Sequence, residues 1–287
     1  MNRIGMVLLL FVLICAQSIQ AEEKQDFWNT ARKGANYYWT RPSIRALARL
    51  AQEKTDFVYY VYGRDSALCR KTLIPDENLK KVQRFLEEAQ QNNLKVVLGV
   101  ASFRSFMEQD PEVGECLWQS KRFQARAVTS WKKLAKQLRG HPALVGYDIL
   151  PFSVTLTKDD SLSDFYRKVL SAIREVDTKT SIILKVKDRK SDLFKQLSGV
   201  NDSNLIYAVE SRAPFELIES QESPFGYPCN NCDENVQKRQ LEAAFIWARQ
   251  LNIPPNRIFI NYSGYLTQLG DRANFLIQNG CHWSCSR

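Results

Sequence analysis

The stretch WKKLAKQLRGHPALVGYDIL, from Trp131 to Leu150, decides the fold. Its first part spaces apolar residues as an amphipathic helix does. The Gly140-His141-Pro142 turn then interrupts that pattern, and the apolar run that follows has the character of a buried strand. A helix, a tight turn and a strand in direct succession form the repeating part of a parallel β-α architecture.

The same alternation continues in both directions from residue 34 onward. Short β-branched or aromatic runs are separated by longer amphipathic stretches, as in parallel β-α units. We expect eight strands, at Gly34–Trp39, Phe57–Tyr62, Val96–Val100, Leu144–Leu150, Ser181–Val186, Leu205–Glu210, Ile258–Ser263 and Cys281–Cys285. Surface helices are expected at Asp76–Asn92, with Asp76 as its N-cap, at Ser161–Val176 and at Glu234–Leu251.

Eight such units favour an α/β protein with a closed (β/α)8 TIM barrel in a single domain. The chain has no G-x-G-x-x-G turn and no P-loop, which argues against an open nucleotide-binding sheet. A length of 287 residues with 44% hydrophobic residues fits one large core. In such a barrel the functional residues are expected at the carboxyl ends of the strands.

The first 21 residues predict a secretory signal peptide, and the barrel is expected to occupy residues 22–287. Arg3 precedes an apolar run that ends before Ala21, and this run is too short for a transmembrane helix. We therefore expect an exported protein, periplasmic or extracellular. A lipoprotein would use Cys15, but the bulky Ile14 before it disfavours that alternative.

Six cysteines remain after the predicted cleavage, an even number that favours disulfides in an exported protein. Cys69 and Cys116 follow the second and third strands, so their loops should emerge side by side and allow a bond. The remaining four are expected to form two bonds whose pairing stays open. A zinc or redox role for these four is the less favoured alternative. They are Cys229, Cys232, Cys281 and Cys285.

The formal net charge of +9 suggests contact with an anionic surface polymer. Basic residues are scattered, and no run is long enough to indicate an arm that binds nucleic acid. His141 belongs to the turn and leaves no histidine cluster for a metal. We expect neither a metal nor a cofactor.

Several phrases of the chain resemble the family-five, cellulase-type glycoside hydrolases, over about Gly34 to Trp283. The most specific is the stretch from Trp131 to Leu150, which resembles the helix and fourth strand that lead into the family's Asn-Glu-Pro. The opening GANYYW and the run LKVVLGV resemble the first and third strands. The resemblance implies a TIM barrel that binds carbohydrate with two catalytic carboxylates near the glycosidic bond.

Both carboxylate positions of that family are replaced here. Pro151-Phe152-Ser153 stands where Asn-Glu-Pro is expected, which puts Phe152 at the acid/base position, and Tyr262 stands at the nucleophile position of the seventh strand. Three supporting positions also differ. They carry Tyr59 in place of Arg, Ala101 in place of His, and Glu210-Ser211-Arg212 in place of His-x-Tyr.

The resemblance therefore implies a catalytically degenerate barrel that binds a carbohydrate or polysaccharide. We assign no catalytic residue. Asp148 is expected to belong to an inner layer of the barrel, and the aromatic residues at strand ends either stack on sugars or fill the emptied pocket. The expected substrate-binding residues are Trp39, Tyr59, Phe152, Glu210, Arg212, Tyr262, His282 and Trp283.

Two other functions remain open. One is an active glycosidase whose carboxylates come from other positions, and the other is an envelope scaffold that uses the barrel to bind a protein. A pair of carboxylates about 5–10 Å apart across the mouth would favour the glycosidase. The candidates for such a pair are Glu210, Asp65, Asp110, Asp159 and Asp160.

Overall fold

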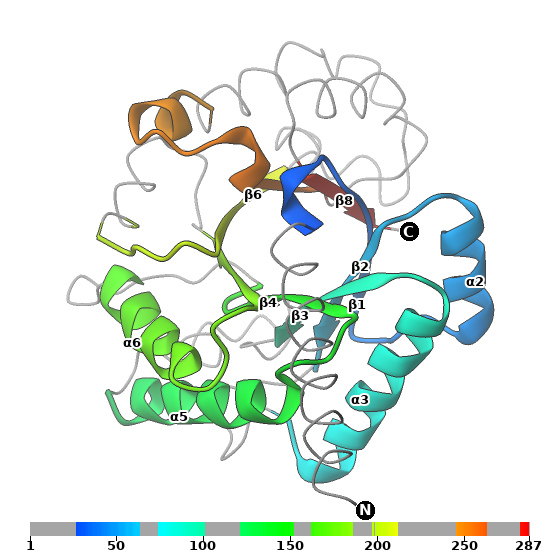
Figure 1. The fold of residues 1–287 in the computed structure, drawn as a ribbon. Coiled ribbons are helices and arrows are strands. Elements are labelled where there is room, and N and C mark those ends of the chain that lie inside the picture. Colours follow the sequence, from blue (N-terminus) through cyan, green and yellow to red (C-terminus); the bar gives the residue numbers. More distant parts are fainter. Residues whose placement is uncertain are drawn as a thin grey trace, which may run out of the picture.

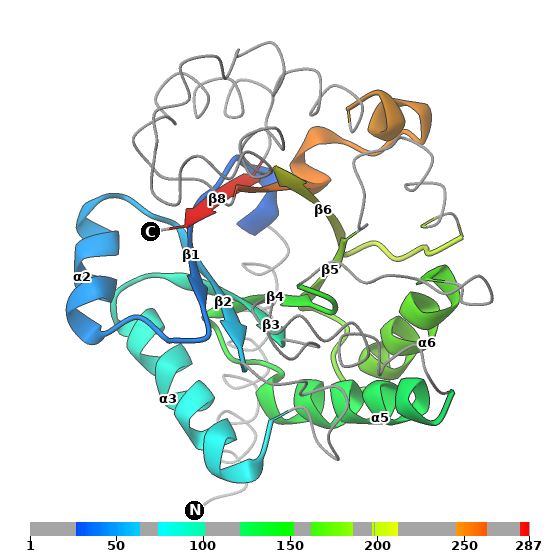
Figure 2. The same ribbon diagram turned by 180° about the vertical axis from the view of Figure 1, so that it is seen from behind.

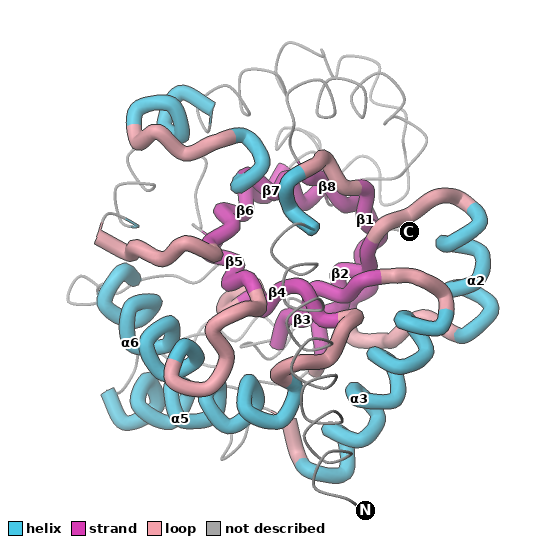
Figure 3. The backbone as a smooth tube through the Cα atoms, viewed as in Figure 1, coloured by secondary structure: helices cyan, strands magenta, loops and turns pink. Residues whose placement is uncertain are grey.

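The structure, a computed structural model, describes residues 27–63, 74–100, 121–151, 162–185, 197, 199–211, 245–262 and 282–286. Its strands hydrogen-bond in chain order as a closed, parallel barrel, and the last strand pairs with the first (Figure 3). The strands are β1 Lys33–Tyr38, β2 Phe57–Tyr62, β3 Lys95–Val100, β4 Leu144–Asp148, β5 Ser181–Lys185, β6 Leu205–Ser211, β7 Ile258–Tyr262 and β8 His282–Ser286.

Strand positions agree with the sequence expectation to within two residues at each end. The middle strands are buried on both faces, as the continuous apolar runs of β2 and β3 require in a parallel sheet. The fourth strand ends at Asp148, two residues before the expected Leu150. There the carboxylate of Asp148 accepts a hydrogen bond from the backbone N–H of Leu150 at 3.2 Å, which turns the chain away from the sheet.

The described helices lie on the outside of the barrel (Figures 1 and 2). They are α2 Ile44–Gln52, α3 Asp76–Gln91, α5 Lys121–Leu138 and α6 Leu162–Arg174, and residues 245–250 are also helical. Ser43 caps α2, because its hydroxyl accepts from the N–H of Ala46. The expected cap of α3 was wrong: Pro75 occupies the N-cap and Asp76 is the first helical residue, since a proline's fixed φ suits a helix start.

Two hydrophobic cores follow from this arrangement. One lies between the strands and the helices, where α5 contributes the fully buried Trp131. The other fills the inside of the barrel, and its lower end is closed by a short 3-10 helix, η1 Phe27–Asn29. Trp28 is completely buried there, and its indole N–H donates to the carbonyl of Val145 at 3.3 Å. The segment before β1 is thus a plug.

A β-bulge in β4 sets which side chains point into the barrel. Val96 pairs with Leu144 but Val97 pairs with Gly146, so Val145 is the extra residue. A Cβ atom at Gly146 would lie only 3.1 Å from Cδ1 of Ile183 and 3.4 Å from Cγ2 of Val97. A side chain at position 146 would therefore push these two neighbours aside by a few tenths of an ångström, and glycine avoids this tight approach. The bulge also brings Asp148 to the inner face.

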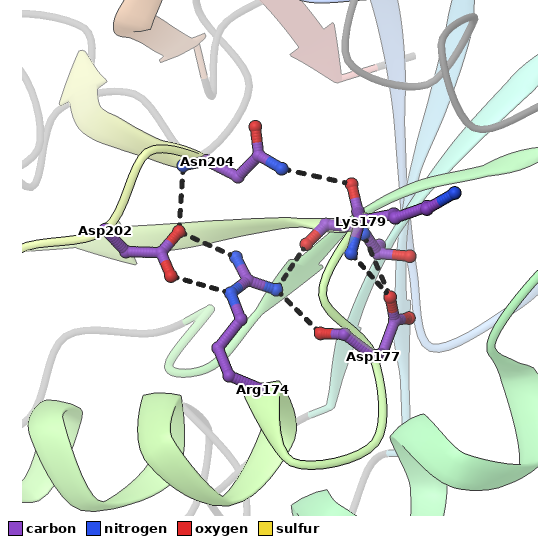
Figure 4. Close-up of polar contacts among 6 residues, drawn as sticks. Arg174, Asp177, Lys179, Asp202 and Asn204 are labelled. Carbon is purple, nitrogen blue, oxygen red and sulfur yellow. Dashed lines mark hydrogen bonds and ion pairs between the residues drawn. The ribbon is translucent and has the colours of Figure 1, made fainter. Parts of the chain in front are cut away.

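An ion pair ties the amino ends of β5 and β6 together (Figure 4). Arg174, the last residue of α6, binds both carboxylate oxygens of Asp202, at 2.7 and 3.0 Å. Its guanidinium also donates to the carbonyls of Asp177 and Thr180, which precede β5. Such a bidentate, partly buried pair fixes two loops at once.

Candidate functional site

A cluster of polar side chains lies inside the barrel, towards the carboxyl ends of the strands. Asp148 ends β4 and is fully buried, and Lys185 ends β5 and is 3% exposed. The Nζ of Lys185 lies 3.7 Å from Oδ2 of Asp148. The hydroxyl of Tyr59, from β2, donates to the same carboxylate oxygen at 2.6 Å. Two strands therefore supply the charges of a buried ion pair, and a third strand supplies a hydrogen bond to its carboxylate.

This pair also holds the turn that follows β4. The Nζ of Lys185 donates to the carbonyl of Pro151 at 2.6 Å, while a Cβ atom built on Gly99 would lie 3.0 Å from Cβ of Pro151. The proline is therefore fixed between β3 and the ammonium group. A buried charge is tolerated only when it is paired and hydrogen-bonded, and Lys185 meets both conditions.

Helix α6 positions Lys185 from outside the barrel. The buried hydroxyl of Tyr166 donates to the carbonyl of Lys185 at 2.7 Å and accepts from its N–H at 3.1 Å. Burial raises the pKa of Tyr166, although the hydrogen bond with Lys185 acts in the opposite direction. The phenol therefore stays protonated and can keep both contacts with the end of β5.

A second, uncharged polar group lies across the barrel. Asn36 of β1 donates its amide N–H to Oδ1 of Asn261 of β7 at 2.7 Å, and both are about 2% exposed. The hydroxyl of Tyr38 reaches the same oxygen at 3.4 Å. The ring of Tyr38 contacts that of Tyr59 edge to face, with centroids 6.1 Å apart. This contact joins the two polar groups.

Trp39 lies at the upper end of β1, half-buried above these groups, and packs against the inner core. Its backbone is in the left-handed region, with φ of 68°. Such a conformation is uncommon and costly for a bulky residue, and strained residues of this kind cluster at functional sites. Its N–H donates to the carbonyl of Val61 at 3.0 Å, which holds the turn. Tyr38 and Trp39 thus form a partly exposed aromatic edge.

The arrangement offers hydrogen-bonding groups and aromatic faces. Asp148 is the one carboxylate whose side chain the structure describes inside the barrel, and its oxygens already accept from Tyr59 and Leu150. Within the described residues, no group of histidine, cysteine, aspartate and glutamate side chains could hold a metal ion. The described helices include none long and apolar enough to cross a membrane.

The sequence-predicted site residues fall into three sets. The side chains of Trp39 and Tyr59 lie inside or at the edge of the barrel, and Tyr59 is buried at the third position of β2. For the predicted residues Glu210 and Tyr262 the structure gives backbone positions: Glu210 pairs with Asn261, and Tyr262 is the last residue of β7. Phe152 and Arg212 lie outside the described residues.

His282 and Trp283 are the first two residues of β8. Trp283 pairs with Ile260 of β7 and with Lys33, the first residue of β1. Its backbone is therefore level with the amino end of β1, whereas the sequence argument expected the mouth. A role for Trp283 in stacking on a sugar remains a prediction.

Sequence reasoning missed four residues of the polar cluster, Asn36, Tyr38, Lys185 and Asn261. Lys185 and Asn261 are polar residues in the mainly apolar strands SIILK and IFINY, and Asn36 and Tyr38 lie in KGANYY of β1. A single polar residue at the inner face of a buried strand needs a partner, and this requirement was the signal available. The assignment of Asp148 to an inner layer agrees with its position.

The model of the cellulase family, glycosyl hydrolase family 5, matches residues 23–262. Similar solved structures include an endoglucanase Cel5A of Pseudomonas stutzeri in complex with cellobiose, with a TM-score of 0.67, 18% identity, and coverage of 89% of this chain and 82% of that one. The cellulose synthase subunit CcsZ of Clostridioides difficile is 16% identical, with a TM-score of 0.68 and coverage of 90% and 91%.

Cel5A of Thermotoga maritima, in complex with mannotriose, is 17% identical, with a TM-score of 0.67 and coverage of 93% and 92%. No curated protein is detectably similar in sequence to this chain. The structural likenesses show the fold. Because the family model spans well over half of the sequence, the chain belongs to glycosyl hydrolase family 5.

Proposed function

We propose that this protein is an exported, non-catalytic member of glycosyl hydrolase family 5 that binds a carbohydrate at the carboxyl end of the barrel. The observation that carries the proposal is the buried pair of Asp148 and Lys185. In a retaining hydrolase the interior supplies one free carboxylic acid and one nucleophilic carboxylate. Here the described inner carboxylate, that of Asp148, accepts a hydrogen bond from Tyr59 and faces the ammonium group of Lys185.

The replaced family positions support the same proposal. Tyr262 is the last residue of β7, where the resemblance places the nucleophile. Phe152 follows Pro151, the residue that Lys185 holds through its carbonyl. Phe152 has no proton to donate and Tyr262 has no carboxylate, and the general acid and the carboxylate nucleophile are each worth orders of magnitude in rate.

The aromatic edge of Tyr38 and Trp39, with the amide pair beneath it, supports carbohydrate binding. Tyr38 and Trp39 present partly exposed rings, and sugar rings stack on such surfaces through their apolar faces. Asn36 and Asn261 are buried and bonded to each other, and the hydroxyl of Tyr38 donates to the shared Oδ1 of Asn261, so the amide pair helps to hold this ring in place. Relatives of the same fold were solved with cellobiose and with mannotriose, so a β-linked glucan or mannan is the ligand class we propose.

The proposal includes an arrangement for the whole chain. Residues 1–21 act as a signal peptide, and the mature chain from residue 22 forms one (β/α)8 barrel with a helix after each strand. The described order from β1 to β8, with α2, α3, α5 and α6 outside it, supports this arrangement.

A second candidate function is an active glycosidase that uses Glu210. Its backbone pairs with Asn261, a residue of the inner face, at the carboxyl end of β6. A carboxylate at this register is suitably placed for chemistry, but a retaining enzyme needs a second one about 5 Å away. The envelope scaffold remains as the third possibility, without an observation that favours it.

The deciding experiment measures binding and hydrolysis on the same samples. The mature protein is titrated with cello- and manno-oligosaccharides, and the same sugars are then analysed for cleavage. We expect binding without cleavage, and about tenfold or greater weakening in Trp39→Ala, as for loss of an aromatic stacking partner elsewhere. Ile44→Ala, an exposed residue of α2, is the control and should bind as the unmodified protein does.

Turnover that disappears in Glu210→Gln would replace the proposal by the glycosidase. If none of these sugars binds, the carbohydrate-binding function is refuted and the scaffold becomes the leading function.

A further inference from the structure

The turn after β1 carries Trp39 in a backbone conformation that needs support from its surroundings. A bulky residue with φ of 68° persists only where the chain on both sides of it is held. On the strand side, the N–H of Trp39 donates to the carbonyl of Val61 at 3.0 Å. The N–H of Thr40 donates to the carbonyl of Tyr38 at 2.7 Å. The other side of the turn, which begins at Arg41, requires an anchor of its own.

Arg41 supplies this anchor through an ion pair with α3. Its Nη1 lies 2.5 Å from Oε2 of Glu88, which follows it by 47 positions in the chain. The side chain of Glu88 is 9% exposed and that of Arg41 is 41% exposed. A buried carboxylate is tolerated in its charged form when it is paired and hydrogen-bonded. Glu88 therefore favours the position of the turn from which Arg41 reaches it.

Helix α3 makes Glu88 a rigid partner. Phe85, one turn earlier on the same helix, is fully buried, and its ring centroid lies 5.1 Å from that of Tyr60 of β2. Arg84 donates to the second carboxylate oxygen of Glu88 at 3.2 Å, although the side chain of Arg84 is 72% exposed. The carboxylate is thus held by its own helix, and that helix is packed on the barrel.

The segment between the anchor and α2 has little conformational freedom. Arg41 precedes Pro42, and a residue before proline is restricted to an extended backbone. Pro42 is buried, and the hydroxyl of Ser43 caps α2. Because this segment is stiff, holding Arg41 in place also sets the direction in which Trp39 and Thr40 leave β1.

We propose that Arg41 and Glu88 are positioning residues of the carbohydrate site, and that their ion pair holds the ring of Trp39 in the orientation that meets a sugar. The inference rests on the proposed function, because it takes Trp39 as the surface on which the sugar stacks. Helix α3 lies outside the barrel, so Glu88 acts through the turn (Figure 1). An ion pair that orders a ring in advance removes the cost of ordering it from the binding step.

The test compares two variants of the mature protein that each remove one donor to the same carboxylate. Arg41→Gln removes the donor that comes from the Trp39 turn. Arg84→Gln removes the donor that comes from α3 itself and is the matched control. Amide hydrogen exchange is measured over residues 37–43, and the same samples are titrated with cello- and manno-oligosaccharides.

We expect Arg41→Gln to speed the exchange of the Trp39 and Thr40 amides by about three- to tenfold, because their hydrogen bonds open more often. Sugar binding should weaken about two- to tenfold, the range expected for ordering one side chain. Arg84→Gln should leave both quantities within about twofold, since its ion pair is largely exposed. In a Trp39→Ala background, Arg41→Gln should cause no further loss of affinity, because the pair acts through that ring.

Three results would overturn the inference. The first is unchanged amide exchange in Arg41→Gln. The second is an equal effect of Arg84→Gln, which would mean that the pair matters only for the stability of α3. The third is a further loss of affinity in the Trp39→Ala background. If Arg41→Gln fails to fold, Arg41→Lys takes its place, with smaller changes in the same direction expected.

Amide exchange requires no ligand, so it reports on the anchor even if no sugar binds. Absence of sugar binding to the unmodified protein refutes the proposed function and with it the ligand of the turn. Unchanged exchange in a protein that still binds sugar refutes the anchor alone.

Discussion

Replacing Lys185 by methionine tests whether the pair at the centre of the barrel is as closely coupled as its geometry indicates. The change removes the ammonium group 3.7 Å from Asp148 and also the donor to Pro151. A buried carboxylate would then remain without its counter-charge, which costs about 3–5 kcal/mol in comparable cases. Tyr59 and the Leu150 N–H still donate to Asp148, so we expect a loss near the lower figure, about 3 kcal/mol.

The measurement is urea unfolding of four proteins: unmodified, Lys185→Met, Asp148→Asn and the double variant. If the two charges stabilise each other, the double variant should lose about 1–3 kcal/mol less than the two single losses added together. For a chain of this size the single loss corresponds to a Tm lower by about 6–12 °C. Lys132→Met is the matched control, because its partner Glu175 is exposed, and it should cost less than about 1 kcal/mol.

A Lys185→Met protein as stable as Lys132→Met would refute the argument. Strictly additive losses in the double variant would refute it as well, because they would mean that Asp148 and Lys185 do not interact.

Three further predictions concern the outer structure. Arg174→Ala should destabilise the protein by about 2–3 kcal/mol, because it breaks the charged hydrogen bonds to Asp202. Burial raises the pKa of Asp202, but the contacts with Arg174 outweigh burial and the pKa is lowered. The stabilisation by this pair is therefore present above about pH 4 and is lost on acidification. Burial raises the pKa of Tyr60 from 10.0 to about 12, so its contribution to the unfolding free energy is complete below pH 10.0 and is lost as the pH rises to about 12. Over that range the unfolding free energy of Tyr60→Phe should fall less steeply than that of the unmodified protein. An equal slope would contradict the assignment. Peptide mapping without reduction should find Cys69 bonded to Cys116; a free Cys69, or one joined to another cysteine, would exclude this pairing.

The positions of the strands could be predicted because each is a compact apolar run between polar or turn residues. β2 and β3, whose residues are nearly all buried, gave the strongest signal. Their parallel order follows from the helices between them, since a parallel connection requires a crossover. The inner contacts could not be predicted in the same way. They depend on which residues of separate strands lie at the same height in the barrel.

The bulge at Val145 shows why register is decisive. Strict alternation from the inward-facing Val145 would place Asp148 on the outer face, and the bulge reverses this. The fit of Gly146 against Val97 and Ile183 is visible only once the strands are paired. The left-handed backbone of Trp39 is similarly a property of the turn, because it depends on the bond from its N–H to Val61. Neither feature leaves a local pattern in the sequence.

The pairing of β8 with β1 has a consequence for how the protein is made. Residues 33–36 hydrogen-bond with residues 283–286, so the two strands are separated by nearly the whole described chain. Such distant contacts slow folding, because a long loop must close before they form. Until β8 is added, β1 and β7 each present an unpaired strand edge, which is a template for aggregation. A chain that lacks residues 282–286 should therefore accumulate as insoluble assemblies, even though every other strand is present.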